Sequence, residues 1–85
     1  MQITLKLYAM LTDYLPDNAA KNEALLNYED SRSVSVAEVI KQFNMPDRLV
    51  HLVLLNGIYL EPEQLATTFL SDSDVLAIWP PVAGG

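Results

Sequence analysis

The C-terminal end of the sequence carries the residues whose chemistry is easiest to interpret. The last seven residues are Trp79, Pro80, Pro81, Val82, Ala83, Gly84 and Gly85. Proline fixes φ at about −65° and cannot continue a sheet ladder, so we expect the chain to leave the fold at Pro80 as a stiff, extended segment. The side chains then become smaller, and glycine lets the backbone approach another protein or a nucleotide closely. We therefore expect the Gly85 carboxylate to be the reactive group.

The same segment has a second interpretation, in which the end of the chain has no chemical role. Chain ends often fray, and small residues there often mean only that nothing packs against them. Here the prolines and the taper in size follow directly after an apolar strand, which makes the reactive interpretation the more specific one. A carboxylate is a poor electrophile, because its charge repels nucleophiles and oxide is a bad leaving group. Gly85 would therefore need to be activated before it reacts.

Size and composition predict one globular domain. The chain has 85 residues, 51% of them hydrophobic and 19% charged, which allows a single core with little surplus stability. We assign residues 1–79 to the folded body and residues 80–85 to an extended tail. The sequence has no cysteine, which excludes disulfides and thiolate metal sites. It also has no glycine-rich phosphate loop and no metal-ligand spacing, so we expect no bound cofactor.

The charge balance narrows the possible partners. Eleven acidic and five basic residues give a net charge of −6, which argues against nucleic acid as a partner. An acidic surface suits a basic protein partner, although it can also serve solubility alone. No basic leader segment and no long apolar stretch stand at the start of the sequence, so we expect a cytoplasmic protein without a membrane anchor.

Several segments have the patterns of β-strands. Residues 2–8 alternate apolar and polar side chains, as a half-buried strand does. Residues 49–55 are almost continuously apolar, which predicts a central strand buried on most of both faces. Asn56-Gly57 follows and favours a type I′ hairpin turn, so residues 58–60 should pair back onto that strand. The other strand-like segments are residues 24–28 and 75–79.

Two segments have helical spacing. Residues 9–15 predict a short helix, in which Met10 and Tyr14 are expected to fill the core and not to contact a ligand. Ser35 and Glu38 have the spacing of a capping box, which predicts that the main helix begins there. The apolar stripe of that helix consists of Val36, Val39, Ile40 and Phe43.

These elements predict an α+β fold with one main helix packed on one face of a mixed sheet. The last strand should lie beside the first in the interior of the sheet, which makes Leu5 a neighbour of Leu76. The tail would then start from the most rigid part of the molecule. Two arrangements of the apolar strand at residues 49–55 remain open. Its side chains that face away from the helix either form an exposed docking patch or are covered by loops and the short helix.

Other polar residues do not form a convincing catalytic set. His51 is the only histidine, and the sequence gives it no serine, cysteine or clustered carboxylate as a partner. Asp72 and Asp74 are spaced like paired carboxylates, but aspartates in a turn usually accept hydrogen bonds from their own backbone. We therefore interpret both aspartates as turn residues.

The run Pro-Pro-Val-Ala-Gly-Gly, after Val75-Leu76-Ala77-Ile78-Trp79, resembles the MoaD/ThiS sulfur-carrier family, and within it the small subunits of molybdopterin synthase. The resemblance implies a ubiquitin-like β-grasp roll. It is strongest from about residue 52 to residue 85. Family members commonly carry Gly-Asp before the last strand, where this chain has Ser73-Asp74, so the type of that turn stays open.

The resemblance also implies a reaction and its partners. A MoeB-like (E1-like) adenylyltransferase would use ATP to adenylate Gly85, and sulfur from a donor protein would replace the adenylate to give a thiocarboxylate. The tail, residues 80–85, would enter a pocket of a MoaE-like large subunit of molybdopterin synthase and deliver sulfur for the dithiolene of molybdopterin, and the residues from Trp79 to Gly84 would make the contacts with the partner. The chain would be a cosubstrate and a subunit with no active site of its own.

Three alternatives remain at this point. The chain could be a ThiS-like carrier for another sulfur pathway, or a ubiquitin-like modifier that is joined to lysines. It could also be an adaptor domain that binds through its sheet while its tail is idle. The length of the chain and the Pro-Pro-Val-Ala run favour the molybdopterin branch.

Overall fold

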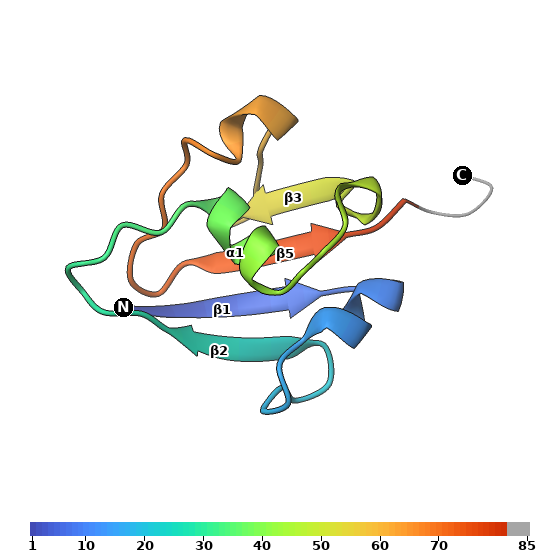
Figure 1. Cartoon of the computed structure of the whole chain (residues 1–85), viewed down its shortest axis with the longest axis horizontal. Coiled ribbons are helices and arrows are strands. Elements are labelled where there is room, and N and C mark those ends of the chain that lie inside the picture. Colours follow the sequence, from blue (N-terminus) through green and yellow to red (C-terminus); the bar gives the residue numbers. More distant parts are fainter. Residues whose placement is uncertain (82–85) are drawn as a thin grey trace.

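The frame of the fold is a five-stranded sheet, seen in a computed structural model that describes residues 1–81 (Figure 1). The strand order is β2-β1-β5-β3-β4. The strands are β1 Gln2–Leu7, β2 Glu23–Asn27, β3 Leu52–Leu55, β4 Ile58–Tyr59 and β5 Val75–Trp79. The central pair, β1 and β5, is parallel, whereas β2 pairs antiparallel with β1, and β3 pairs antiparallel with both β5 and β4. The predicted α+β fold with a mixed sheet is confirmed.

Alternation along β1 decides which face of the sheet carries the core. Ile3, Leu5 and Leu7 are each 0% exposed, whereas the polar side chains between them are only half-buried. Leu5 pairs with Leu76 of β5, as the predicted topology requires. The last strand therefore runs through the interior of the sheet beside the first one.

The main helix, α1 (Val36–Gln42), crosses this core face (Figure 1). The predicted capping box is present: Ser35 Oγ accepts a hydrogen bond from the Glu38 N–H at 3.2 Å, and Glu38 Oε1 accepts one from the Ser35 N–H at 3.4 Å. Two orphaned donors at the helix start are thereby satisfied. After the helix, Asn44 takes a φ of +60°, a left-handed conformation that stops it from continuing. The buried side chains of the helix are Val36, Val39 and Ile40.

The predicted short helix is a 3₁₀ helix, η1 (Ala9–Tyr14). Leu11 is completely buried and Tyr14 packs against the core, but Met10 is 56% exposed, so the prediction that Met10 fills the core is wrong. A 3₁₀ helix has three residues per turn, which places Leu11 and Tyr14 on one face and turns Met10 outward. Among residues 1–81 no helix is long and apolar enough to cross a membrane.

The apolar run at residues 49–55 is only partly a strand. Its first part belongs to a 3₁₀ turn, η2 (Asp47–Leu49), and β3 begins at Leu52. Only Val53 of β3 is buried, so the prediction of burial on most of both faces is wrong. The reason is that the sheet carries α1 on one face and no second layer of helix within residues 1–81. A further 3₁₀ turn, η3 (Pro62–Gln64), follows the hairpin.

The predicted hairpin turn joins β3 to β4. Asn56 and Gly57 have φ values of +52° and +82°, which is the pair of positive angles that a type I′ turn needs. Leu55 pairs with Ile58 on either side of the turn. The interpretation of Asn56-Gly57 as the hairpin signal is therefore confirmed.

Candidate functional site at the root of the C-terminal tail

The last described residues, Trp79, Pro80 and Pro81, form the tail root. Trp79 ends β5, and two neighbouring segments hold the backbone there. The Tyr8 N–H donates to the Ile78 carbonyl oxygen at 3.2 Å from one side, and the His51 N–H donates to the Trp79 carbonyl oxygen at 3.0 Å from the other. Trp79 is thus fixed in the interior of the sheet, where β5 lies between β1 and β3 (Figure 1).

Aromatic packing adds to these backbone bonds. The rings of Tyr8 and Trp79 are stacked, with centroids 4.2 Å apart and planes only 2° from parallel. The Trp79 side chain is half-buried and lies on the sheet face opposite α1, because its neighbour Ile78 is fully buried on the core side. Trp79 is therefore a surface aromatic residue at the start of the tail and not a member of the core.

The remaining tail residues lie outside the described part of the chain. Pro80 is still buried, and Pro81 is the first exposed residue after β5. The predicted taper and reactive end consist of Val82, Ala83, Gly84 and Gly85. Their roles, and the assignment of residues 80–85 as an extended tail, stay predictions.

The sheet face opposite α1 is here called the open face. The sequence left open whether the apolar side chains on this face are exposed or covered. Leu52 pairs with Trp79, and Leu54 pairs with both Ala77 and Tyr59, so these side chains share that face. Leu52 and Leu54 are only partly buried, and Tyr59 is 47% exposed. The open face therefore presents an apolar surface to solvent directly beside the tail root. The apolar residues of this surface are Tyr8, Leu52, Leu54, Tyr59 and Trp79; Ala77 lies among them but is buried, and Lys6 of β1 lies beside Ala77 on the same face.

Comparison with protein families decides what kind of protein carries this arrangement. The model of the ThiS family matches residues 18–85 of the chain, which is most of its length. The chain belongs to the ThiS family. It is thus a member of the ubiquitin-like sulfur carriers of ThiS and MoaD type, as the C-terminal run indicated. A comparison with curated proteins gives no match.

Several solved structures share the fold of the chain. SAMP1 from Haloferax volcanii is 20% identical with a TM-score of 0.66, and the thiamine biosynthesis protein ThiS from Geobacter metallireducens is 21% identical with a TM-score of 0.65. A complex of subunits 1 and 2 of the molybdopterin-converting factor from Helicobacter pylori contains a chain that is 19% identical, with a TM-score of 0.60. In each case the alignment covers 100% of both chains. These likenesses establish the β-grasp fold of the chain.

The aspartates before β5 have the structural role that the sequence suggested. Asp74 Oδ2 accepts from the Ser71 N–H at 2.7 Å, and Asp74 Oδ1 accepts from the Asn56 side-chain amide at 2.8 Å. Asp72 Oδ1 accepts from the Gln2 N–H at 2.7 Å. Both carboxylates are therefore used to close the turn and to tie it to β1 and to the hairpin. Ser73 between them has a φ of +71°, a conformation that favours glycine.

No other part of residues 1–81 assembles a catalytic or metal-binding set. Within this range there is no group of three His, Asp or Glu side chains that could hold a metal ion. The His51 side chain is exposed, and its structural contact is made by its backbone N–H. His51 therefore contributes to the backbone geometry of the tail root.

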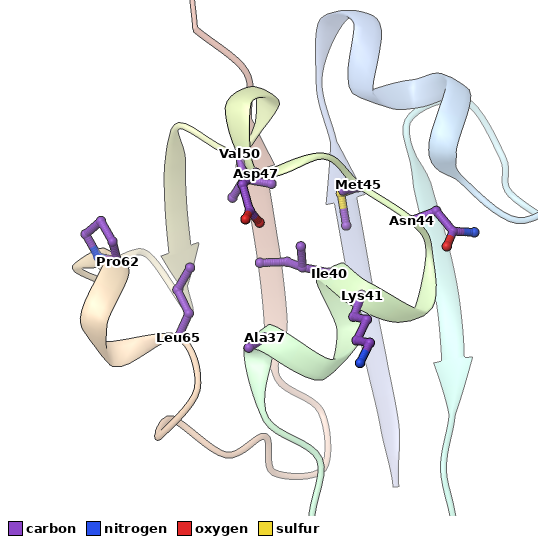
Figure 2. Close-up of a pocket in the computed structure, with 9 residues that line it drawn as sticks. All are labelled: Ala37, Ile40, Lys41, Asn44, Met45, Asp47, Val50, Pro62 and Leu65. Carbon is purple, nitrogen blue, oxygen red and sulfur yellow. The ribbon is translucent and has the colours of Figure 1, made fainter.

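A groove of about 690 Å³ lies on the other side of the sheet, next to α1 (Figure 2). Its walls come from α1, from the segment around η2 and from the segment around η3. The charged side chains among its lining residues are Lys41 and Asp47, and no nucleophile and base come together in it. The candidate site among the described residues therefore remains the tail root.

Sequence reasoning identified Trp79 but missed Tyr8. Leu7, the last residue of β1, pairs with Ile78 of β5. One residue further along each strand, Tyr8 lies beside Trp79. The signal was present in the predicted parallel pairing of the first and last strands. It could be used only once the register of that pairing was known.

Proposed function

We propose that this protein is a sulfur carrier whose Gly85 carboxylate is adenylated and then converted to a thiocarboxylate. One observation carries the proposal. This chain belongs to the ThiS family and ends in Gly-Gly, and the residue from which its tail starts, Trp79, is fixed in the interior of the sheet. The folded body would present the C-terminal acyl group on a narrow segment, where other proteins can modify it.

The proposed chemistry needs a partner that supplies activated phosphate, because a carboxylate is a poor electrophile until it is adenylated. A Gly85 carboxylate oxygen would attack the α-phosphorus of ATP on an E1-like, MoeB-like adenylyltransferase, and pyrophosphate would leave. Sulfur at the oxidation level of hydrosulfide, supplied by a donor protein, would then attack the acyl carbon, and AMP would leave. The product is a thiocarboxylate whose sulfur is a better nucleophile than the original oxygen.

The body would contribute recognition. The open face gives a partner an apolar surface next to the tail root, and a surface aromatic such as Trp79 is typical of interface anchors. A net charge of −6 would speed encounter with a basic partner. Buried Pro80 would limit the conformations available to the tail before it enters a channel.

For the recipient of the sulfur we propose a MoaE-like large subunit of molybdopterin synthase, with this chain as the small subunit. The Pro-Pro-Val-Ala-Gly-Gly end supports this choice. So does the likeness to a chain in the Helicobacter pylori complex, which joins subunits 1 and 2 of a molybdopterin-converting factor. In that role the tail would enter the large subunit and give up sulfur to a pterin precursor.

A ThiS-like role in thiamine synthesis is the second candidate. It is favoured by the family model that matches residues 18–85 and by the likeness to the Geobacter metallireducens protein. Both candidates use the same thiocarboxylate and differ only in the acceptor.

One reconstitution separates these roles. The thiocarboxylated chain is incubated with the host's molybdopterin-synthase large subunit and precursor, and separately with its thiazole synthase and substrates. Molybdopterin formation in the first mixture alone supports the proposal, and turnover in the second alone supports the ThiS-like role. Isopeptide conjugates on lysines after incubation with lysate and ATP would instead indicate a protein modifier.

Tail variants test the reactive end itself. Gly84→Ala, Gly84→Pro and removal of Gly85 should abolish activation while the urea midpoint of unfolding is unchanged, because these residues follow the folded body. Normal thiocarboxylate formation by such variants would contradict the role of the Gly-Gly end.

A further inference from the structure

The stack between Tyr8 and Trp79 is the closest aromatic contact at the tail root. With centroids 4.2 Å apart and planes 2° from parallel, the Tyr8 ring covers one side of the Trp79 ring. Within residues 1–81 the Tyr8 hydroxyl makes no hydrogen bond, so Tyr8 acts there through its ring. The contact is one of packing and orientation.

The backbone around Tyr8 is itself held firmly. The Tyr8 N–H donates to the Ile78 carbonyl oxygen at 3.2 Å, and the Tyr8 carbonyl oxygen accepts from the Leu11 N–H at 3.1 Å. Leu11 is completely buried, which ties η1 and therefore Tyr8 to the core. The Tyr8 ring is thus a fixed support and not a side chain on a loose loop.

Ala9, directly after Tyr8, has an unusual backbone conformation. Its φ of +52° lies in the left-handed region, which a residue other than glycine adopts only where its surroundings hold it. This angle turns the chain out of β1 and into η1 immediately after Tyr8. The strained turn therefore places the last extended residue beside Trp79.

We propose that Tyr8 is a positioning residue for the tail. By stacking on the Trp79 ring, Tyr8 fixes the direction in which the chain leaves β5, so that more docked molecules present Gly85 correctly than would do so without the stack. This inference rests on the proposed function, because it concerns delivery of the same carboxylate. Tyr8 could instead be a docking contact for the partner, and the two roles have different kinetic consequences.

A docking contact contributes to binding, so its loss raises KM. A positioning residue acts after the body has docked, so its loss lowers kcat while KM changes little. The test compares Tyr8→Ala, Tyr8→Phe and Leu54→Ala as full chains in ATP–pyrophosphate exchange with the host's E1-like adenylyltransferase. Leu54→Ala is the matched docking control, because Leu54 lies on the same open face away from the stack.

We expect Tyr8→Ala to lower kcat about three- to ten-fold with KM within about two-fold of the unaltered chain, since a loosened side chain adds conformations that must be ordered. Tyr8→Phe should have the kcat of the unaltered chain, because phenylalanine keeps the aromatic ring. Leu54→Ala should raise KM and leave kcat unchanged. A Tyr8→Ala variant that only raises KM, or that matches the unaltered chain, overturns the positioning role.

Two physical readouts follow the stack without the partner. Trp79 is the only tryptophan, so its fluorescence reports on the stack, and the His51 amide reports on the Trp79 carbonyl. In Tyr8→Ala the emission should shift and the His51 amide should exchange several-fold faster, and in Tyr8→Phe the exchange rate should match that of the unaltered chain. Unchanged emission and exchange in Tyr8→Ala would overturn the inference. Absence of nucleotide exchange with the unaltered chain would instead overturn the proposed function.

Discussion

The two faces of the sheet are built from the same strands but differ in how far their apolar side chains are buried. On the core face, Leu5, Leu76 and Ile78 are each 0% exposed beneath α1. On the open face, Leu54 and Trp79 are only partly buried although their side chains are also largely apolar. The core face stabilises the fold, whereas the open face keeps apolar surface available beside the tail root.

This difference follows from the size of the domain. A chain of 85 residues with one main helix can cover one face of a five-stranded sheet, and its described residues supply no second layer. Contiguous apolar surface that remains exposed on a protein is typical of interaction sites. The same strands can therefore carry stability on one side and recognition on the other.

Truncation on the core face should have the largest effect on stability. Leu76→Ala removes a fully buried side chain from the central strand and leaves a cavity, so the free energy of unfolding should fall by about 3 kcal/mol. Urea denaturation followed by circular dichroism measures the change. A loss below about 1 kcal/mol would mean that this face does not carry the core.

The matched change on the open face is Leu54→Ala. Because Leu54 is partly exposed, we expect a loss of unfolding free energy below about 1 kcal/mol, but about ten-fold weaker binding to the adenylyltransferase. Titration calorimetry measures the binding. If this variant is as unstable as Leu76→Ala, or binds normally, the contrast between the faces is wrong.

The helix that covers the core face depends on its N-terminal cap. Ser35→Ala removes the side-chain acceptor for the Glu38 N–H and should lower the free energy of unfolding by about 1 kcal/mol. Thermal unfolding checks this value, with Ser35→Thr as the conservative control that keeps an acceptor oxygen. Equal losses in both variants would show that the cap hydrogen bond is not what the helix needs.

The smallest effect is expected at the turn before β5. Ser73 has a φ of +71°, so Ser73→Gly should relieve strain and raise the free energy of unfolding by about 0.5 kcal/mol, net of the extra freedom of glycine in the unfolded chain. Ser71→Gly in the same loop is the control and should be slightly destabilising, because Ser71 is not among the residues with positive φ. A Ser73→Gly variant that is less stable than the unaltered chain would contradict this account of the turn.

Local patterns predicted most of the frame. The alternation in β1, the capping box at Ser35 and the Asn56-Gly57 turn each depend on neighbouring residues, and the structure confirms all three. The apolar run at residues 49–55 was misjudged because periodicity alone does not show where a strand begins or which faces are covered. Met10 was misplaced because the tighter 3₁₀ turn changes which residues share a face.

The candidate site was only half predictable. Trp79 and the Gly-Gly end are visible in the sequence as a continuous segment. Tyr8 lies far from them in the chain and meets Trp79 only through the register of β1 and β5. Contacts of this kind depend on tertiary structure, so no local pattern reveals them.

The most direct test of the central claim is the intact mass of the protein purified from its own host. We predict a population whose mass is higher by the difference between one sulfur and one oxygen atom, located at Gly85 by fragmentation and lost when Gly85 is removed. A terminal carboxylate that never carries sulfur, in the host or after reconstitution with ATP, the adenylyltransferase and a sulfur donor, would contradict the account.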